Sequence, residues 1–242
     1  MSTPETAVDG CASGLVVAVD GPSGSGKSSV SREVARRLGL AYLDTGAMYR
    51  ALAWWCLDQH VDLHDRAAVA GAGERLPLVI TTDPAEVHVL VDGADVSEQI
   101  RSTGVSEQVS LVATNLAVRE QMRRRQRALI TEHPVGTVAE GRDITTVVAP
   151  DAAVRVLLTA SERARLERRA RELHGSTDDD ALAATHDQVV RRDRDDSTVS
   201  QFAVAAAGVV TIDSSGLGFE QVVDAVLALV EQRTGRRPVV TA

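Results

Sequence analysis

Apolar residues along this chain gather in short runs, separated by longer segments in which they recur at helical spacing. The first run, Leu15-Val-Val-Ala-Val-Asp20, is typical of a strand buried on both faces. Strands that alternate with helices in this way predict an α/β fold, with helices on both faces of a parallel sheet and ligands at the carboxyl ends of the strands. We expect strands at 15–20, 40–43, 136–139, 154–159 and 209–212, and helices at 27–38, 46–59, 105–131, 162–174, 177–192 and 219–232.

Residues 60–105 interrupt this alternation. Two β-rich runs, 78–82 and 87–91, are joined by Asp83-Pro-Ala-Glu86, and an Asp92-Gly93 turn follows. Turn residues between two such runs are typical of an antiparallel hairpin. We therefore expect a small antiparallel insert at 60–105, a core domain formed by 15–59 and 106–232, and flexible tails at 1–14 and 233–242.

Composition narrows the classes of partner. Hydrophobic residues make up 44% of the 242 residues, which suits a globular protein, but aromatic residues make up only 2%. Few aromatic side chains argue against the stacking platforms of single-strand nucleic-acid binders. A net charge of -8 argues against coating nucleic acid or an anionic membrane. We therefore expect small-molecule substrates, and neither a nucleic-acid nor a membrane partner.

The cysteines and the start of the chain indicate a compartment. Cys11 and Cys56 form no C-x-x-C pair, which is typical of incidental thiols in a reducing environment. Residues 1–14 lack the basic region and apolar run of a signal peptide, and no apolar run approaches the ~18 residues of a membrane span. We expect a cytoplasmic protein, and a monomer.

The first glycine-rich turn carries a specific local motif. Gly21-Pro-Ser-Gly-Ser-Gly-Lys-Ser28 matches G-x-x-x-x-G-K-[ST] between a predicted strand and a predicted helix. The glycines let backbone N–H groups point inward as a cradle for phosphates, a P-loop. Lys27, the single lysine among 26 basic residues, would reach the β- and γ-phosphates, and the Ser28 hydroxyl would ligate Mg²⁺. We expect ATP to bind through Gly21, Pro22, Ser23, Gly24, Ser25, Gly26, Lys27, Ser28 and Ser29.

Other features separate the classes of P-loop protein. Guanine-specific GTPases read their base with N/T-K-x-D, which would need a second lysine, and the LSGGQ signature of ABC-type ATPases is also absent from the sequence. Both absences favour a kinase that acts on a small metabolite. Asp44 and Glu140 each end a predicted strand and could ligate Mg²⁺ directly or through water; the alternative for each is a loop carboxylate that caps a turn.

Longer motifs follow one another along the chain: Asp20-Gly-Pro-Ser-Gly-Ser-Gly-Lys-Ser-Ser29, Leu43-Asp-Thr-Gly-Ala-Met-Tyr-Arg50, Val96-Ser-Glu-Gln-Ile-Arg101, Arg123-Arg-Arg-Gln-Arg127, Glu140-Gly-Arg-Asp143 and Arg192-Asp-Arg-Asp-Asp-Ser197. In this order they resemble the motifs of bacterial cytidylate kinases, and the resemblance covers about residues 15–232. It implies phosphoryl transfer from ATP to CMP or dCMP, on a P-loop NTPase-type sheet with an enlarged nucleotide-monophosphate-binding insert and a helical lid.

The resemblance also implies roles for individual residues. Arg50 and Arg142 would hold the CMP phosphate, while Ser110, Arg119 and Asp143 would read the cytosine edge. Arg165, Arg168 and Arg169 fall where the family places an arginine-rich helix near the ATP. The expected catalytic residues are Lys27, Arg142 and Arg192; the CMP site comprises Thr45, Tyr49, Arg50, Ser110, Arg119, Arg142, Asp143, Arg192 and Asp196; the ATP site adds Arg165 and Arg169; and the metal site comprises Ser28, Asp44 and Glu140.

The chain departs from the family pattern in the expected lid, residues 174–205. Gly175 and Ser176 are the candidate hinge. The family usually places an arginine where this sequence has Val199, and a Pro-Leu pair after it, which is also missing. Arg191 or Arg194 could replace the missing phosphate-binding cation.

The expected chemistry agrees with these residue types. A carboxylate such as Asp143 accepts from the cytosine amino group, and a donor such as Arg119 serves the ring acceptors. Uracil would present a carbonyl to Asp143, so we expect a preference for CMP over UMP of ~1–3 kcal/mol. The acceptor phosphate has a second pKa of about 6, so it attacks as a dianion and needs no general base.

Plainer explanations compete for several features. The arginines of 123–127 suit a solvated helix face, and Trp54 and Trp55 suit the core. His60 and His64 have metal-binding spacing without an obvious third ligand. Rival functions are a kinase for UMP or shikimate, a nucleotide-binding regulator without transferase activity, and a nucleic-acid-dependent ATPase.

Overall fold

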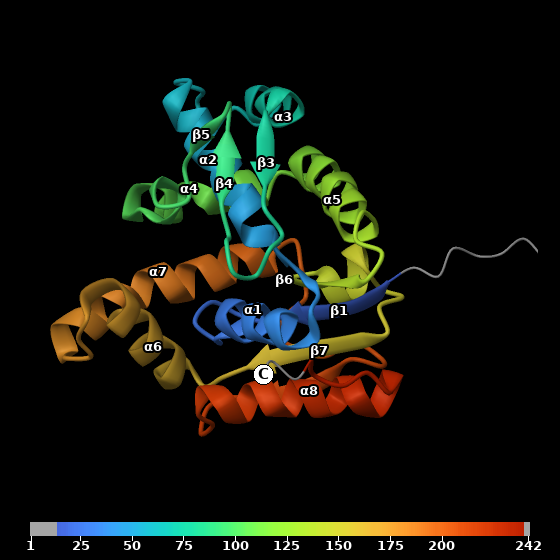
Figure 1. Cartoon of the computed structure of the whole chain (residues 1–242). Helices are drawn as coiled ribbons and strands as arrows, with labels where there is room; N and C mark the ends of the chain where they lie inside the picture. The colour runs from blue at the N-terminus through green and yellow to red at the C-terminus, as the bar shows by residue number, and fades with distance from the viewer. Residues whose placement is uncertain (1–13, 240–242) are drawn as a thin grey trace, which may run out of the picture.

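The computed structural model describes residues 14–239, so Cys11 lies outside the described part of the chain. Five parallel strands form the central sheet (Figure 1). Asp20, at the end of the middle strand, pairs in register with Gly141, and Asp44 with Glu140. The α/β prediction is confirmed. The strand order is β2 (Ala41–Asp44), β6 (Gly136–Gly141), β1 (Leu15–Asp20), β7 (Val154–Thr159) and β8 (Val210–Asp213).

Alternate residues of β1 belong to two different apolar cores. Val17 and Val19 pack with α1 (Lys27–Leu38) and α8 (Phe219–Thr234). Ala18 belongs to a second core built with α2 (Thr45–Asp58), α4 (Thr103–Ala113) and α5 (Leu116–Thr131). Because helices bury both faces of the sheet, the polar chemistry collects at the strand ends. Trp54 and Trp55 pack against the second core, as predicted.

The insert contains the predicted antiparallel hairpin and more. Strands β3 (Leu78–Ile80), β4 (Val89–Val91) and β5 (Ala94–Asp95) form a second sheet. The turn between β4 and β5 places Asp92 and Gly93 at φ values of 50° and 77°. A helix missed in the sequence, α3 (Arg66–Arg75), precedes the sheet, and a 3₁₀ turn, η1 (Gln99–Arg101), follows it.

The prediction of a single helix at 105–131 is wrong, because the chain leaves the helical conformation at Thr114 and Asn115, between α4 and α5. The Asn115 side chain accepts from the Ala117 N–H at 3.2 Å, so it caps the start of α5. Its amide group donates to the Arg66 carbonyl at 2.8 Å, and the Arg66 guanidinium donates to the Thr114 carbonyl at 2.7 Å. Tertiary hydrogen bonds therefore hold the break.

Two helices project beside the core at the left of Figure 1. Helix α6 (Glu162–His174) begins at the predicted Ser161 cap and ends at Gly175, whose φ is 67°. Helix α7 (Asp179–Ser197) runs further than the predicted end at Arg192, and so carries Asp196 within its last turn. Between β6 and β7 lies a π-helical turn, η2 (Ile144–Val148).

The expected tail at 233–242 begins within a helix, since α8 continues to Thr234. Arg236 then donates to the Leu38 and Val135 carbonyls at 2.9 and 3.2 Å.

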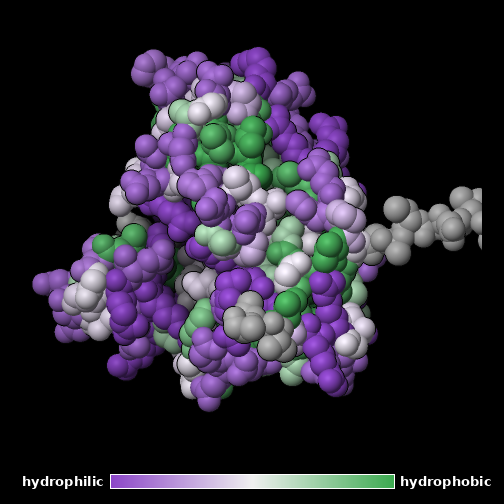
Figure 2. Space-filling view, viewed as in Figure 1, coloured by the Kyte–Doolittle hydropathy of each residue, from purple (hydrophilic) through white to green (hydrophobic). Residues whose placement is uncertain are grey.

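Within the described residues, no helix is both long and apolar enough to cross a membrane. Figure 2 shows a mostly hydrophilic face, with a hollow between the α6–α7 lobe and the rest of the molecule.

Candidate active site

A cavity of about 500 Å³ opens where the P-loop, the insert and helix α7 meet. It lies at the carboxyl ends of β1, β2 and β6, as expected for a parallel sheet. Eight basic and five acidic side chains from the described part of the chain line it, although the whole chain has a net charge of -8. This positive surplus suits polyanionic ligands. The basic residues are Lys27, Arg50, Arg101, Arg119, Arg142, Arg168, Arg169 and Arg192.

The phosphate cradle has the backbone geometry that its motif predicts. Gly26 has a φ of 89° and directly precedes α1, so that the helix N-terminus opens toward the cavity. A Cβ on Gly24 would lie 2.7 Å from the Arg165 carbonyl, so glycine allows α6 to approach the loop. Arg168 braces the loop by donating to the Ser25 carbonyl at 3.3 Å and to Ser214 Oγ at 2.8 Å.

Lys27 lines the cavity as a half-buried cation. Its Nζ donates to the Pro22 carbonyl at 3.4 Å. Burial, followed by repulsion from Arg142, lowers the pKa of the Lys27 ammonium to about 8. A polyphosphate beside Lys27 would supply the anionic partner that favours its charged form.

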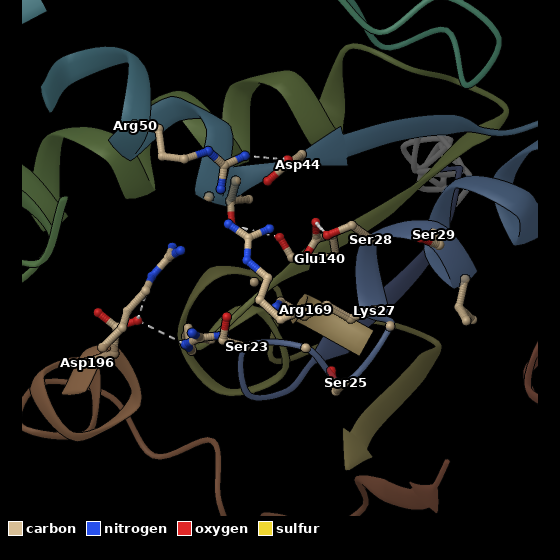
Figure 3. A pocket seen from close by; sticks show the side chains of 18 of the residues that line it. Ser23, Ser25, Lys27, Ser28, Ser29, Asp44, Arg50, Glu140, Arg169 and Asp196 are labelled. Carbon is tan, nitrogen blue, oxygen red and sulfur yellow. Dashed lines mark hydrogen bonds and ion pairs between the residues drawn. The ribbon is translucent and has the colours of Figure 1, made fainter. Parts of the chain in front are cut away.

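Two carboxylates and one hydroxyl gather beside Lys27 (Figure 3). Ser28 Oγ donates to Glu140 Oε1 at 2.6 Å, and Tyr42 donates to the same oxygen at 3.3 Å. Burial and the charge of Asp44 raise the pKa of Glu140. Asp44 caps α2 by accepting from the Ala47 N–H at 2.9 Å. The turn-capping role weighed for Asp44 is therefore present.

Arg50 extends from α2 over the end of β2. Its Nη2 donates to Asp44 Oδ2 at 2.8 Å. Burial is the largest influence on the pKa of Asp44 and raises it, but the Arg50 guanidinium, the Ala47 N–H and Arg101 together hold the pKa of that carboxyl below its usual value. Among the described residues, the buried Nε atoms of Arg50, Arg165 and Arg192 have no hydrogen-bond partner. Such donors are costly unless a ligand engages them.

On the insert side, Arg119 and Asp143 form a close pair. Arg119 Nη2 donates to Asp143 Oδ2 at 2.6 Å, and both side chains are largely buried. Asp20 holds the segment after β6 in place, because its carboxylate accepts from the Ile144 and Thr145 N–H groups at 2.8 Å each. A carboxylate at the end of β1 thus orients the segment that carries Arg142 and Asp143.

Arg142 connects the P-loop to helix α7. Its guanidinium donates to the Gly21 carbonyl at 2.6 Å and to Asp193 and Asp196 at 3.0 Å each. The Phe202 ring lies 4.6 Å from the guanidinium carbon, a cation–π contact. Arg192 lies 3.7 Å from the Asp196 carboxylate, and burial, then Arg142, lowers the pKa of Arg192 to about 10.

Most of the residues predicted from sequence meet in this cavity. Gly21, Pro22, Arg165 and Ser110 are not part of its lining. Gly21 and Pro22 act through their carbonyls, and Arg165 lies behind the loop, where it donates to the Ser23 carbonyl at 3.0 Å. The lining residues from the predicted sets are Ser23, Gly24, Ser25, Gly26, Lys27, Ser28, Ser29, Asp44, Thr45, Tyr49, Arg50, Arg119, Glu140, Arg142, Asp143, Arg169, Arg192 and Asp196.

Other lining residues were missed. Helix α4 presents Ser106, and not Ser110, to the cavity, together with Val109 and Ala113. Arg101 lines it from the end of the 96–101 motif, which was the available signal for this residue. Arg191 and Arg194, considered as replacements for a cation at position 199, do not line the cavity; the Arg194 side chain is 77% exposed.

The family follows from comparison with known proteins. The family model described as cytidylate kinase matches residues 17–232. The chain belongs to the cytidylate kinase family. A cytidylate kinase of Rhodococcus opacus strain B4 is 50% identical over 226 residues, covering 92% of this chain and 97% of the relative. A cytidylate kinase of Cutibacterium acnes is 49% identical over 220 residues, covering 89% and 96%.

One further sequence relative and one solved structure extend the comparison. The cytidylate kinase of Streptomyces avermitilis is 42% identical over 220 residues, covering 90% of this chain and 94% of the relative. A solved structure of an uncharacterized protein from Eubacterium ventriosum matches 90% of this chain and 99% of its own, with a TM-score of 0.51 and 11% identity. That likeness concerns the fold alone.

Proposed function

We propose that the cavity carries out the family reaction, ATP-dependent phosphorylation of CMP and dCMP to CDP and dCDP, with the residue roles given below. One observation carries this assignment beyond family membership: the P-loop and the Arg119–Asp143 pair line the same cation-rich cavity. A triphosphate on the P-loop and a cytosine on the pair would bring donor and acceptor phosphates together over Arg50, Arg142 and Lys27. Direct in-line transfer needs this arrangement.

The donor side would be formed by the P-loop and the helix behind it. Backbone N–H groups at the start of α1 and the Lys27 ammonium would hold the β- and γ-phosphates. Arg169 lines the cavity, where its guanidinium would contact phosphate, and it is paired with Glu172 at 2.8 Å. Leu217 and Phe219 are partly exposed apolar residues of the same lining and would suit the face of the donor base.

The acceptor side would be formed by α2, α5 and the segment after β6, with Arg101 from the end of the insert. Asp143 and Arg119 would read the cytosine edge, and the Arg50 and Arg142 guanidinium groups would hold the CMP phosphate. Arg192 and Asp196 would contact phosphate and the sugar hydroxyls from the lid, with Thr45 and Tyr49 in the lining beside them. The insert at 60–105 would contribute to CMP binding through Arg101, and residues 174–205 would close over the site as the lid.

The chemistry would depend on charge neutralisation and exclusion of water. The acceptor phosphate is mostly a dianion at pH 7, with a pKa of about 6, so no side chain must remove a proton. Convergent cations offset repulsion between two polyanions and stabilise the charge of the transferring group. Closure of α7 over the cavity would keep water from competing as the acceptor.

Ser28 and Glu140 fit a Mg²⁺ site. A hydroxyl and a carboxylate, 2.6 Å apart at the edge of the cavity, match the few oxygen ligands that Mg²⁺ takes from protein when phosphates and water complete its shell. Asp44 would act beside them, through water. When bound, the ion would neutralise charge on the phosphates.

Replacing Glu140 by glutamine should raise the Mg²⁺ concentration for half-maximal activity by about 10–100-fold, because the amide keeps the shape but loses the charge. Titrating kinase activity with MgCl₂ measures this. Glu132→Gln, at the exposed end of α5, is the control and should leave the midpoint unchanged. An unchanged midpoint in the Glu140 variant would remove Glu140 from the metal site.

We also propose that the enzyme acts as a cytoplasmic monomer. The phosphate-binding, base-reading and metal-binding roles proposed above are all assigned to side chains that line this one cleft. Cys56 is a buried free thiol whose pKa is raised to about 11 by burial, which suits a reducing compartment.

The reaction is tested by ADP formation from ATP and Mg²⁺ with CMP, dCMP, UMP, AMP or no acceptor. We expect strong dependence on CMP and dCMP and a low rate with UMP. Equal rates with every acceptor, or none above the blank, would refute the proposed acceptor. A nucleotide-binding regulator would bind ATP without acceptor-dependent turnover, and stimulation by RNA or DNA would indicate a nucleic-acid-dependent ATPase.

Replacing Asp143 by asparagine should shift acceptor choice. Asparagine keeps the side-chain shape but can donate to the uracil carbonyl, so kcat/KM for CMP should fall and the CMP:UMP ratio should drop about 10–100-fold, the span of one polar base contact. Both acceptors are measured side by side. If both rates fell by the same factor, Asp143 would support the fold of the site without reading the base.

A further inference from the structure

Asp193 lies on helix α7 and has none of the roles assigned above. Its carboxylate contacts three separate segments of the chain. Its Oδ1 accepts from the Ser23 backbone N–H of the P-loop at 3.0 Å and from Arg142 Nη2 at 3.0 Å. Its Oδ2 accepts from Nη1 of Arg165 on α6. One carboxylate therefore joins the lid helix, the P-loop, the segment after β6 and the helix beside the lid.

The contacts around Asp193 are reciprocal and shielded from water. Arg165 donates to the Ser23 carbonyl at 3.0 Å, so the same residue is held through both its N–H and its carbonyl group. The side chains of Asp193, Arg142 and Arg165 are 14%, 13% and 12% exposed. Charge-assisted hydrogen bonds at such low exposure hold their partners in fixed orientations.

A carboxylate beside the P-loop opposes the negative charge of a triphosphate bound there. Two guanidinium groups offset this charge, and each keeps further donors for other partners: Arg142 reaches Gly21 and Asp196, and the buried Nε of Arg165 has no hydrogen-bond partner in the described structure. Asp193 therefore orients cations without using all of their hydrogen-bonding capacity.

We propose that Asp193 is a positioning residue for phosphoryl transfer, which ties the closed lid to the P-loop at Ser23 and sets the orientation of Arg142 and Arg165. This inference rests on the proposed function, since it assumes that Arg142 meets the transferring phosphoryl group. Lid closure and arginine placement then become one event: when α7 reaches the P-loop, both arginines gain their orienting partner.

The test compares Asp193→Ala, Asp193→Asn and Asp193→Glu with Asp195→Ala, a control on the same helix that forms a 3.9 Å ion pair with the exposed Arg194. We expect kcat to fall about 100-fold in Asp193→Ala, as for a misplaced reacting group, with smaller changes in KM for ATP and CMP. Asp193→Asn keeps an acceptor for the Ser23 N–H but loses the charge, so its kcat should lie between those of Asp193→Ala and the wild type. Asp195→Ala should keep wild-type kcat.

Two further readouts separate positioning from simple stability. Hydrogen exchange of the P-loop peptide should rise in Asp193→Ala and much less in Asp193→Asn, because only alanine removes the acceptor of the Ser23 N–H. In a double-mutant cycle, Asp193→Ala with Arg165→Ala should be no slower than the slower single variant, because residues of one network are not additive. If Asp193→Ala does not fold, as judged by thermal unfolding, the asparagine and glutamate variants provide the test.

Three results would overturn the inference: unchanged kcat in Asp193→Ala and Asp193→Asn, independent multiplication of the Asp193 and Arg165 effects, or a lower KM for ATP in Asp193→Ala. The last would identify the carboxylate as an obstacle that ATP displaces. A wild-type protein without CMP-dependent ADP formation would refute the proposed function instead, and the exchange experiment would still measure the tie between Asp193 and Ser23.

Discussion

Replacing Lys27 by methionine is expected to lower kcat on the order of 10³-fold, the upper range for removing one preorganised electrostatic group from an active site. Methionine fills a similar volume but carries no charge, so the β- and γ-phosphates would lose the ammonium that lies in the cavity beside Glu140. Among the described residues, no second lysine can take this place, because the sequence has none. Steady-state ADP formation with saturating CMP measures the effect.

Lys27→Arg is the informative companion variant. It keeps the charge, but a planar guanidinium is larger and makes forked contacts where the lysine ammonium makes a single point contact. We expect activity well below wild type and above that of Lys27→Met. A Lys27→Met variant within tenfold of wild type would show that the surrounding arginines carry the charge stabilisation without the lysine.

Replacing Arg142 by alanine is expected to lower kcat by a similar factor and also to destabilise the protein. The guanidinium would no longer pair with Asp193 and Asp196, whose side chains are 14% and 9% exposed, and the Gly21 carbonyl would lose its donor. Asp193 keeps Arg165, and Asp196 keeps Arg192 at 3.7 Å, so neither charge is left unpaired, and we expect the loss of these charged hydrogen bonds to cost about 1.5–3 kcal/mol. Kinetics and denaturant-induced unfolding of the same preparation measure both effects.

Arg142→Lys and Arg194→Ala complete that experiment. Lysine restores the charge but cannot donate to Gly21, Asp193 and Asp196 together, so it should recover more stability than activity. Arg194 is on the lid with its side chain 77% exposed, and its loss should change neither quantity beyond about 0.5 kcal/mol. If Arg142→Lys and Arg142→Ala lost the same amount of stability, the forked geometry of the guanidinium, and not its charge, would hold the lid.

Local sequence predicted the elements whose signals are short-range. The bounds of β1, α1 and β7 agree with prediction, because an apolar run or a helical spacing next to glycine is a local property. The break at Asn115 and helix α3 were missed. Asn115 is a favoured cap residue and was an available signal, but its partner Arg66 is distant in sequence. Gly71 and Gly73 weakened the helical signal of α3.

Gly73 illustrates why α3 is helical although its glycines have low helix propensity. A Cβ at this position would lie 2.4 Å from the Gln121 side-chain oxygen of α5. The glycine leaves room for the Gln121 side chain, whose Nε2 donates to the Ala70 carbonyl of α3 at 3.1 Å, so contacts with α5 support a helix of low intrinsic propensity. Contacts of this kind are set by the tertiary structure and leave no periodic pattern.

The sequence alone determined the phosphate cradle, the sheet, the family resemblance and most of the cavity-lining residues, because each depends on residue types at fixed local spacing. Only the tertiary structure decided which charged side chains meet. Asp193 on α7, Arg165 on α6 and Ser23 in the P-loop are far apart in sequence, and they converge because strand order and helix packing place them there. Ion pairs between distant segments carry no local signal. The sequence alone therefore could not show which arginines face the cavity, or that Arg191 and Arg194, the candidates to replace a cation at Val199, do not line it.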